Sequence, residues 1–387
     1  MSKATASMII FSLLVLMLPL QSLPINNGYS QIYYKEDVDN SKLNILPISL
    51  NNSLSEQDTV TADTTNESRD VEKAVILMFD RGYKTQFTEA KPILDKYGFK
   101  ASFFIICSFI QGAGYHKLDN GSESYHDLSD SDSNSAMSWD EIKQMYKEGH
   151  DIESHGNEHR DLRKLSSEEL EQEIADSKKC LTDQGLKPTY FQFPNNKGNG
   201  NSTVLKMVSR FFDFGLADHS KLMFLNCDGW VNHGFKTQSY KYQYDCNPYA
   251  ADGTATRTNK YSIREWSHDR EHSHLNNDNP SLAPHGTEIS DKMYIEFIRV
   301  AEGANTYNTK AGKIVAVPII GYHEISNSSD FDTSIELFDR EMNYLHSNGF
   351  KVLKLSDLGY NQTGNYFFIR EMQNRDLDPQ LASTTDK

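Results

Sequence analysis

Short apolar runs that alternate with helical segments are the feature of this 387-residue chain that most restricts its fold. Residues 74–79 predict a buried strand, residues 88–97 a helix that ends at Gly98, and residues 101–106 a second buried strand. A strand, a helix and a strand at this spacing indicate a βαβ unit, in which the two strands are parallel.

The same alternation continues toward the C-terminus. The helix predicted at 139–148 has Ser138 as its N-cap and Gly149 as its stop, and the helix at 166–181 begins with a capping box of Ser166 and Glu169. The remaining predicted elements are helices at 202–212 and 334–348 and strands at 150–154, 190–193, 314–320 and 351–353. Residues 227–285 show no clear periodicity. This order favours an α/β architecture, either a barrel or an open sheet.

The N-terminus has the pattern of an export signal. Lys3 precedes an apolar run at 8–20, which has the length of a signal-peptide core and is short for a membrane span. No clear cleavage site follows, so both a signal peptide and an uncleaved anchor remain open at 1–23. Residues 24–70 predict a flexible polar spacer, residues 71–360 a folded domain with insertions near 107–137 and 226–285, and residues 361–387 a tail.

Two further features agree with a location outside the cell. Acceptor triplets for N-glycosylation occur at Asn51, Asn66, Asn120, Asn201, Asn327 and Asn361. The four cysteines allow three pairings, of which Cys227 with Cys246 is the local one and would contribute roughly 3 kcal/mol. Cys107 lies in an apolar strand and could equally be a buried free thiol. The formal net charge of −15 excludes nucleic acid as a partner.

Polar side chains follow three of the apolar strands. Asp80 ends the first, the pair His155 and His159 follows the strand at 150–154, and His323 follows the strand at 314–320. The carboxyl ends of parallel strands form one mouth, where α/β enzymes place their sites. On a helical turn, His155 and His159 would share a face and reach one metal ion.

Each of these residues also has a structural explanation. Asp80 could cap the next element or pair with Arg81, and His323 could be a core histidine with satisfied hydrogen bonds. The histidine pair could lie on an exposed face. In the catalytic alternative, Asp80 is a general base and His323 is the acid that protonates a leaving group.

Taken together, these segments resemble the polysaccharide deacetylase family (NodB homology domain, similar to carbohydrate esterase family 4). Residues 76–82 and 100–105 resemble the family's T-F-D-D-G and K-A-T-F-F segments, and residues 149–162 its histidine motif. Residues 191–194 resemble its R-x-P motif, with Gln192 for arginine before Pro194, and residues 317–325 its closing L-x-H strand. Residues 226–230, including Asp228 and Trp230, are a loose echo of its D-x-x-D-W stretch.

The resemblance implies a distorted (β/α) barrel that binds zinc or another divalent cation. It implies that Asp80 is the catalytic base, that His155 and His159 are metal ligands, and that His323 is the acid. In that chemistry the metal polarises an acetamide carbonyl and activates water, which attacks to form a tetrahedral oxyanion.

Arg81 departs from the family, because it stands where the family has a metal-binding aspartate. A guanidinium cannot ligate a cation. Asp80 could become the third ligand and pass the role of base to Asp151 or Glu153, Arg81 could turn away, or the metal could be absent. Alternatively, Arg81 could replace the arginine missing at Gln192 and orient Asp80 or stabilise the oxyanion.

The function implied is hydrolysis of N-acetyl C–N bonds on an extracellular polysaccharide or glycan. The alternatives are an impaired, glycan-binding barrel and a metal-independent hydrolase of cyclic amides. A membrane is a partner only if the N-terminal segment stays uncleaved. Tyr83, Tyr115, Trp230 and Trp266 could stack on sugars, and the histidines at 268, 272 and 274 are expected in a solvated loop.

Overall fold

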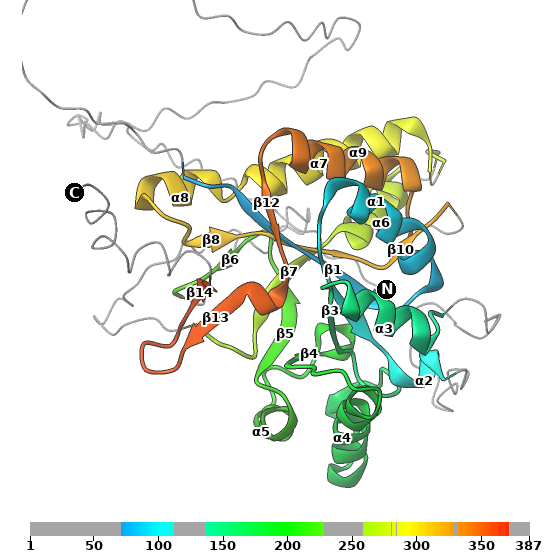
Figure 1. Cartoon of the computed structure of the whole chain (residues 1–387), viewed down its shortest axis with the longest axis vertical. Helices are drawn as coiled ribbons and strands as arrows, with labels where there is room; N and C mark the ends of the chain where they lie inside the picture. Colours follow the sequence, from blue (N-terminus) through cyan, green and yellow to red (C-terminus); the bar gives the residue numbers. More distant parts are fainter. Residues whose placement is uncertain are drawn as a thin grey trace, which may run out of the picture. The chain divides into compact units, whose positions relative to one another are not determined.

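Seven parallel strands close into a barrel in the computed structural model, which describes residues 71–111, 136–227, 258–279, 281–283, 285–327 and 332–370. Their order is β1, β2, β3, β4, β5, β7 and β9, and β9 pairs back to β1. The strands span Ala74–Arg81, Ser102–Ile105, Asp151–Ser154, Tyr190–Gln192, Phe214–His219, Ile263–Ser267 and Ile319–Tyr322. A further parallel strand, β12 (Lys351–Leu353), pairs with the start of β1. The expected (β/α) barrel is confirmed (Figure 1).

Helices surround the strands, as Figure 1 shows, with α1, α7 and α9 on one side and α4 and α5 on another. The helices are α1 (Lys91–Tyr97), α2 (Cys107–Ile110), α3 (Trp139–Lys147), α4 (Ser167–Asp183), α5 (Ser202–Phe211), α6 (His268–Asp278), α7 (Thr287–Glu302), α8 (Asn305–Ala311) and α9 (Ile335–Ser347). The short strands β6 (Met223–Phe224) and β8 (Ala316–Val317) pair with each other, as do β10 (Glu324–Ile325) and β11 (Asp332–Thr333).

The alternation of side chains along β1 separates two cores. Val75, Leu77 and Phe79 pack with apolar side chains of the surrounding helices, whereas Ile76 and Met78 belong to a cluster formed largely by the other strands. Successive residues of a strand point to opposite faces, so the second cluster fills the barrel interior. The hairpin of β13 (Leu358–Asn361) and β14 (Tyr366–Ile369) adds apolar side chains to this interior cluster.

The predicted helix ends are confirmed where capping residues marked them. Ser138 and Ser166 each accept a hydrogen bond from the third backbone N–H of their helix, and Glu141 and Glu169 complete the capping boxes. Gly98 ends α1 with φ of 71°, in the left-handed region that glycine adopts without strain.

Two regions differ from the prediction. The segment 227–285, which lacks periodicity, contributes β7 and α6, because buried polar side chains interrupt their apolar patterns. The hairpin continues the fold to Ile369, so the expected start of a tail at 361 falls inside it. The predicted signal and spacer at 1–70, and most of the first insertion, lie outside the described residues.

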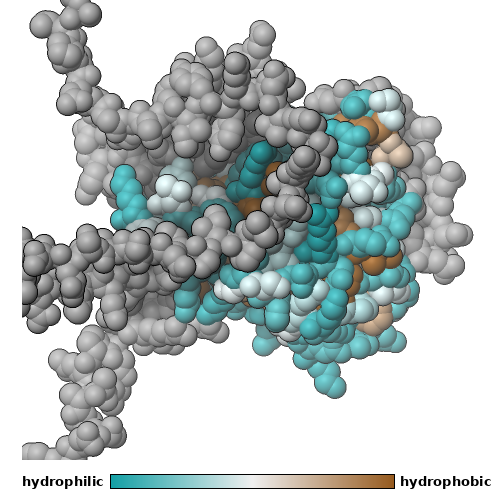
Figure 2. Space-filling model, turned by 90° about the horizontal axis from the view of Figure 1, so that it is seen from above, coloured by the Kyte–Doolittle hydropathy of each residue, from teal (hydrophilic) through white to brown (hydrophobic). Residues whose placement is uncertain are grey.

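The cysteine predictions are also revised. Cys107 forms a disulfide with Cys180 of α4, so the free-thiol alternative is wrong. Cys227 is disulfide-bonded as well, whereas Cys246, its predicted local partner, lies outside the described residues. The described part of the face seen in Figure 2 is mostly hydrophilic. No helix among the described residues is long and apolar enough to cross a membrane.

Candidate active site

Inward-pointing polar residues gather at the carboxyl ends of the barrel strands. Asp80 follows Ile76 and Met78 on the inner face of β1, and His323 follows Gly321 beyond the end of β9. The alternation that buries the interior apolar residues therefore also directs these two side chains inward. Gln192 ends β4 on the same face and hydrogen-bonds to Asp80.

Asp80 lies between two polar partners. Its Oδ2 accepts a hydrogen bond of 2.7 Å from Nε2 of Gln192 and lies 3.7 Å from Nε2 of His323. Its Oδ1 is buried and has no hydrogen-bond partner among the described residues. Burial raises the pKa of Asp80, although the charge of His323 and the hydrogen bond from Gln192 act in the opposite direction. The carboxylate is therefore held at one oxygen, and the other oxygen has no hydrogen-bond partner among the described residues.

The side chain of Gln86 holds the ends of β1 and β9 together. Its Nε2 donates to the backbone carbonyl of Asp80 at 2.6 Å and to that of His323 at 2.7 Å. Gln86 is fully buried, so this bridge has little freedom to move. Two residues far apart in the sequence are thereby fixed in relative position.

His323 is oriented by Asp269, at the start of α6. Oδ2 of Asp269 accepts from the backbone N–H of His323 and lies 3.1 Å from its Nδ1. Burial alone would raise the pKa of Asp269, but hydrogen bonds from His268 and His323 hold it below its ordinary value. An ionised Asp269 requires the proton on Nδ1 of His323, so that Nε2 is the nitrogen directed toward Asp80.

His155 and His159 come together through a loop rather than a helical turn. Their ring centroids are 4.5 Å apart, and the chain between them turns at Gly156, with φ of 89°, while His159 itself has φ of 58°. Burial lowers the pKa of His155 to about 3 and holds that of His159 well below its usual range, so both imidazoles are neutral at pH 7. The expectation that a helical turn brings the two histidines together was wrong, but their rings do lie next to each other.

This histidine loop is held from two sides. Glu173 of α4 is buried and accepts hydrogen bonds from the backbone N–H of Glu158 at 2.9 Å and of Arg160 at 3.5 Å. Burial raises the pKa of Glu173 to about 7, against the lowering effect of these backbone donors. Pro194 lies against Gly156, where an added Cβ would be 3.6 Å from its Cγ and 2.7 Å from Oε1 of Glu173. A larger residue at position 156 would therefore displace the loop.

Arg81 is buried next to this group rather than turned into solvent. It has φ of 75°, an unusual value for arginine, and its Nη1 donates to the hydroxyl of Tyr83 at 3.0 Å. Its charge contributes to lowering the pKa values of Asp80, His155 and His159. The hydrogen-bond donor to Asp80 is Gln192, so Gln192 keeps an orienting role without a charge.

The donor set does not fit a resident divalent cation. Within the described ranges, no group of three or more His, Cys, Asp or Glu side chains could hold a metal ion. Zinc needs three protein ligands at a catalytic site, whereas this site offers two imidazoles beside a guanidinium. Asp80 does not complete such a group in this geometry, so the interpretation of Asp80 as a third ligand is not supported.

Asp151 and Glu153 are engaged by backbone donors away from Asp80. Asp151, at the start of β3, accepts from the N–H of Ser356 at 2.8 Å, and Glu153 accepts from the N–H groups of Thr189 and Tyr190, where β4 begins. This geometry does not support either residue as the base in place of Asp80. Asp228 and Trp230 lie outside the described residues.

The region with no clear periodicity supplies residues that the sequence analysis missed. His268 and His272 are fully buried on α6 and do not belong to a solvated loop. Glu265 of β7 is buried near Asp80, whose charge adds to burial in raising the pKa of Glu265. Its Oε2 would be 2.1 Å from a Cβ at Gly321, so a side chain at position 321 would displace the Glu265 carboxylate. Polar residues at the end of a strand could have indicated this part of the site. Arg264 and Glu265 interrupt the apolar pattern of β7, however, so the strand itself was not predicted.

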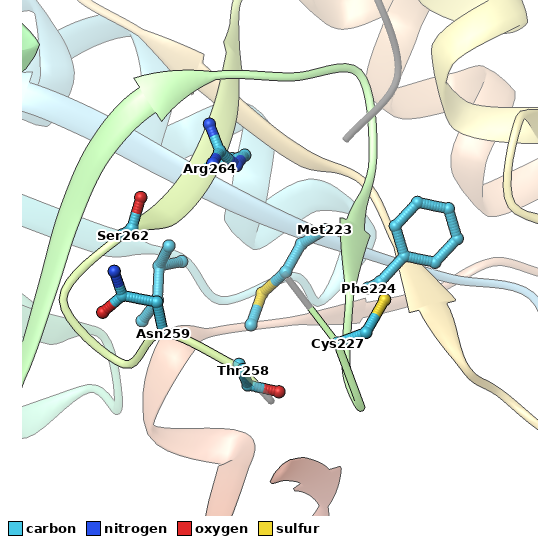
Figure 3. A pocket seen from close by; sticks show the side chains of 8 residues that line it. Met223, Phe224, Cys227, Thr258, Asn259, Ser262 and Arg264 are labelled. Carbon is cyan, nitrogen blue, oxygen red and sulfur yellow. The ribbon is translucent and has the colours of Figure 1, made fainter. Parts of the chain in front are cut away.

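A small pocket lies elsewhere, near β6 and the start of β7 (Figure 3). Its lining contains Met223, Phe224, Thr258 and Asn259 but none of the site residues named above. The candidate site is therefore defined by the polar residues at the strand ends. The fold and these residues describe a closed (β/α) barrel in which a buried carboxylate and a partly buried imidazole form a pair suited to acid–base chemistry.

Comparisons with known proteins find similarity to polysaccharide deacetylases. Residues 67–211 match the family model described as polysaccharide deacetylase. The chain is 34% identical over 147 residues to the putative polysaccharide deacetylase YxkH of Bacillus subtilis (strain 168), which covers 38% of this chain and 44% of that protein. The chain thus matches less than half the length of this curated relative.

Two solved structures are similar at low identity. The Streptococcus pyogenes deacetylase PplD is 24% identical, with a TM-score of 0.31, over 38% of this chain and 56% of that one. The peptidoglycan deacetylase PdaC of Bacillus subtilis is 16% identical, with a TM-score of 0.40, over 74% and 89%. Residues 67–211 are therefore similar to the polysaccharide deacetylases.

Proposed function

We propose that this chain hydrolyses the N-acetyl C–N bond of a sugar residue in an extracellular polysaccharide, with Asp80 as base and His323 as acid. The observation that carries the proposal is the arrangement of the two side chains. Nε2 of His323 lies 3.7 Å from Oδ2 of Asp80, and each side chain is held by its own partner, Asp269 or Gln192. The buried Oδ1 of Asp80, which has no hydrogen-bond partner among the described residues, is the oxygen that takes the proton of the water.

The reaction then has two steps, addition of water and expulsion of the amine. A water oxygen attacks the amide carbonyl carbon while Asp80 takes one proton of that water. The C–O double bond becomes a tetrahedral oxyanion. Doubly protonated His323 gives the proton on Nε2 to the amide nitrogen, and the C–N bond breaks. The products are acetate and a free amine on the sugar.

The oxyanion requires a positive group. The family generally supplies a metal for this purpose, but the donor set of this chain does not fit one. We therefore assign the role to Arg81, a buried cation whose charge acts on Asp80 and both loop histidines. A fixed cation in a water-poor site stabilises developing negative charge without reorganisation.

Export belongs to the same proposal. It is supported by Lys3 with the apolar run at 8–20 and by the Cys107–Cys180 disulfide, because such bonds persist in oxidising compartments. N-terminal sequencing of protein recovered from culture medium tests it. A chain retained inside the cell with reduced cysteines would contradict it.

Acetate release from a panel of N-acetylated polymers, with and without chelator, tests the activity. We expect release that persists in chelator and disappears in Asp80→Asn. A second function, binding of a glycan without catalysis, is favoured by the loss of the ligand at Arg81. Polymer binding that is equal in the native chain and in Asp80→Asn, with no acetate from either, would establish that second function.

A further inference from the structure

A buried chain of hydrogen bonds runs from His323 to the outside of the barrel. Thr333 of β11 donates from Oγ1 to Oδ1 of Asp269 at 2.5 Å and lies 2.9 Å from Nδ1 of His268. Nε2 of His268 lies 2.7 Å from Oε1 of Glu341 on α9, whose Oε2 accepts from the hydroxyl of Tyr322 at 2.8 Å. All these groups are buried, so no bulk water competes for their hydrogen bonds.

The direction of each hydrogen bond follows from counting protons. Asp269 is ionised and can only accept, so the single hydroxyl proton of Thr333 goes to Asp269. Thr333 must then accept from Nδ1 of His268, whose Nε2 is in hydrogen-bond contact with Glu341. Against the effect of burial, Glu341 and Asp269 raise the pKa of His268 to about 9, which favours a second ring proton on Nε2 that is donated to Glu341.

The two oxygens of Asp269 have separate partners. Oδ1 is held by Thr333, and Oδ2 accepts from both the backbone N–H and Nδ1 of His323. If Oδ1 were released, the carboxylate could rotate and would no longer hold Nδ1 of His323 in one position. The ring nitrogen that acts on a substrate is set by the hydrogen bond that the other one makes.

We propose that Thr333 and His268 are positioning residues that fix, through Asp269, which ring nitrogen of His323 faces the reacting bond. This rests on the proposed function, in which His323 is the acid. The two residues touch neither the substrate nor the reacting atoms. They act by holding one orientation of Asp269.

A matched pair of variants at position 333 tests the proposal. Thr333→Val has nearly the same shape but no hydroxyl, and Thr333→Ser keeps the hydroxyl. In acetate-release kinetics we expect kcat to fall about tenfold in Thr333→Val with KM unchanged, and to be restored in Thr333→Ser. An unchanged kcat in Thr333→Val, or an equal loss in Thr333→Ser, would overturn the proposal.

A second measurement does not need activity. At a pH alkaline enough to remove one ring proton, the ¹⁵N chemical shifts of the His323 ring report which nitrogen keeps the other proton. We expect a proton fixed on Nδ1 in the native chain and in Thr333→Ser, and a mixture of tautomers in Thr333→Val.

If Thr333→Val does not fold, His268→Gln serves in its place, since it also removes one of the two donors from the network. If the native chain releases no acetate, the proposed activity is refuted. If its His323 tautomer is nevertheless fixed, and these variants lose it, the positioning role still holds. An identical tautomer in native and variant chains would refute the positioning role.

Discussion

Nε2 of His323 and Oδ2 of Asp80 lie 3.7 Å apart at the carboxyl end of the barrel, and the amide of Gln86 hydrogen-bonds to the backbone carbonyls of both residues. This relationship brings the proposed base at the end of β1 next to the proposed acid, which follows β9. Five predictions follow from the site and from the bonds that hold it.

Replacing Asp80, the proposed base, should abolish the proposed acetate release without harming the fold. We expect Asp80→Asn to lower kcat for acetate release by at least about 100-fold. The pKa of Asp80 is raised by burial, so its ionised form costs free energy in the folded chain, and the neutral amide should leave the melting temperature equal or higher. Asp151→Asn, at the opposite end of the barrel, is the control and should keep its activity. Loss of activity in the control alone would contradict the assignment.

The hydrogen bond from Gln192 should set the acid limb of the pH profile. Asp80 must be ionised to act as a base, so activity falls as the pH drops through its pKa. In Gln192→Arg a cation would lower that pKa and move the acid limb of kcat/KM down by about one pH unit. Gln192→Met removes the donor and should move the limb up. Shifts in the same direction in both variants would refute this role.

Restoring a ligand at position 81 should create a metal site. Arg81→Asp would place a carboxylate next to His155 and His159, and aspartate tolerates the positive φ better than arginine. We expect about one zinc ion per chain by elemental analysis after dialysis, and its loss when His159→Ala is added. The native chain is the comparison. If it held stoichiometric zinc that a His155→Ala/His159→Ala variant lost, the argument from the donor set would be wrong.

Reduction of the Cys107–Cys180 disulfide should destabilise the region of the histidine loop. The bond closes a loop with a sequence separation of 73 residues, and the chain-entropy relation gives about 4 kcal/mol. The backbone N–H groups of Cys107 and Ser108 donate to the carbonyls of Gly156 and Asn157, so the anchored helix also supports the loop. Thermal unfolding of the Cys107→Ala/Cys180→Ala variant, with and without reductant, measures the effect. A melting temperature equal to that of the oxidised native chain would contradict it.

The buried His268–Glu341 pair should make stability fall at alkaline pH. A raised pKa of about 9 for His268 means that its stabilisation is fully present below its unfolded value of 6.5 and is lost as the pH rises through 9. Burial also raises the pKa of Glu341, so its contribution to stability is likewise lost as the pH rises. The shift in the pKa of His268 corresponds to about 3 kcal/mol of stability. Asp269 and Tyr322 are the other titratable groups that contact the pair.

Urea unfolding at pH 6 and pH 9.5 tests this dependence. We expect the difference between the two pH values to shrink in His268→Gln. His272→Gln, a change at another buried histidine of α6, is the matched control and should keep the native pH dependence. An equal reduction of the difference in both variants would assign it to general damage of the helix.

The sequence determined the first half of the barrel because its local signals agree there. Apolar strands with clear alternation, capping boxes at Ser138 and Ser166, and a glycine stop at Gly98 are short-range effects, so their outcome can be deduced from neighbouring residues. The same holds for Asp80 and His323, which stand directly after apolar strands, and for the absence of the usual aspartate at Arg81.

Only the tertiary structure decided the rest. β7 and α6 bury Glu265, His268 and Asp269, whose polarity hides the strand and helix patterns, because their partners come from distant elements. Closure of the barrel between β9 and β1 selected the pairing of Asp80 with His323, and the path of α2 against α4 selected the Cys107–Cys180 disulfide. The sequence shows which side chains are present. A charge can be buried only when a partner compensates it, and here the partners come from elements that only the fold brings together.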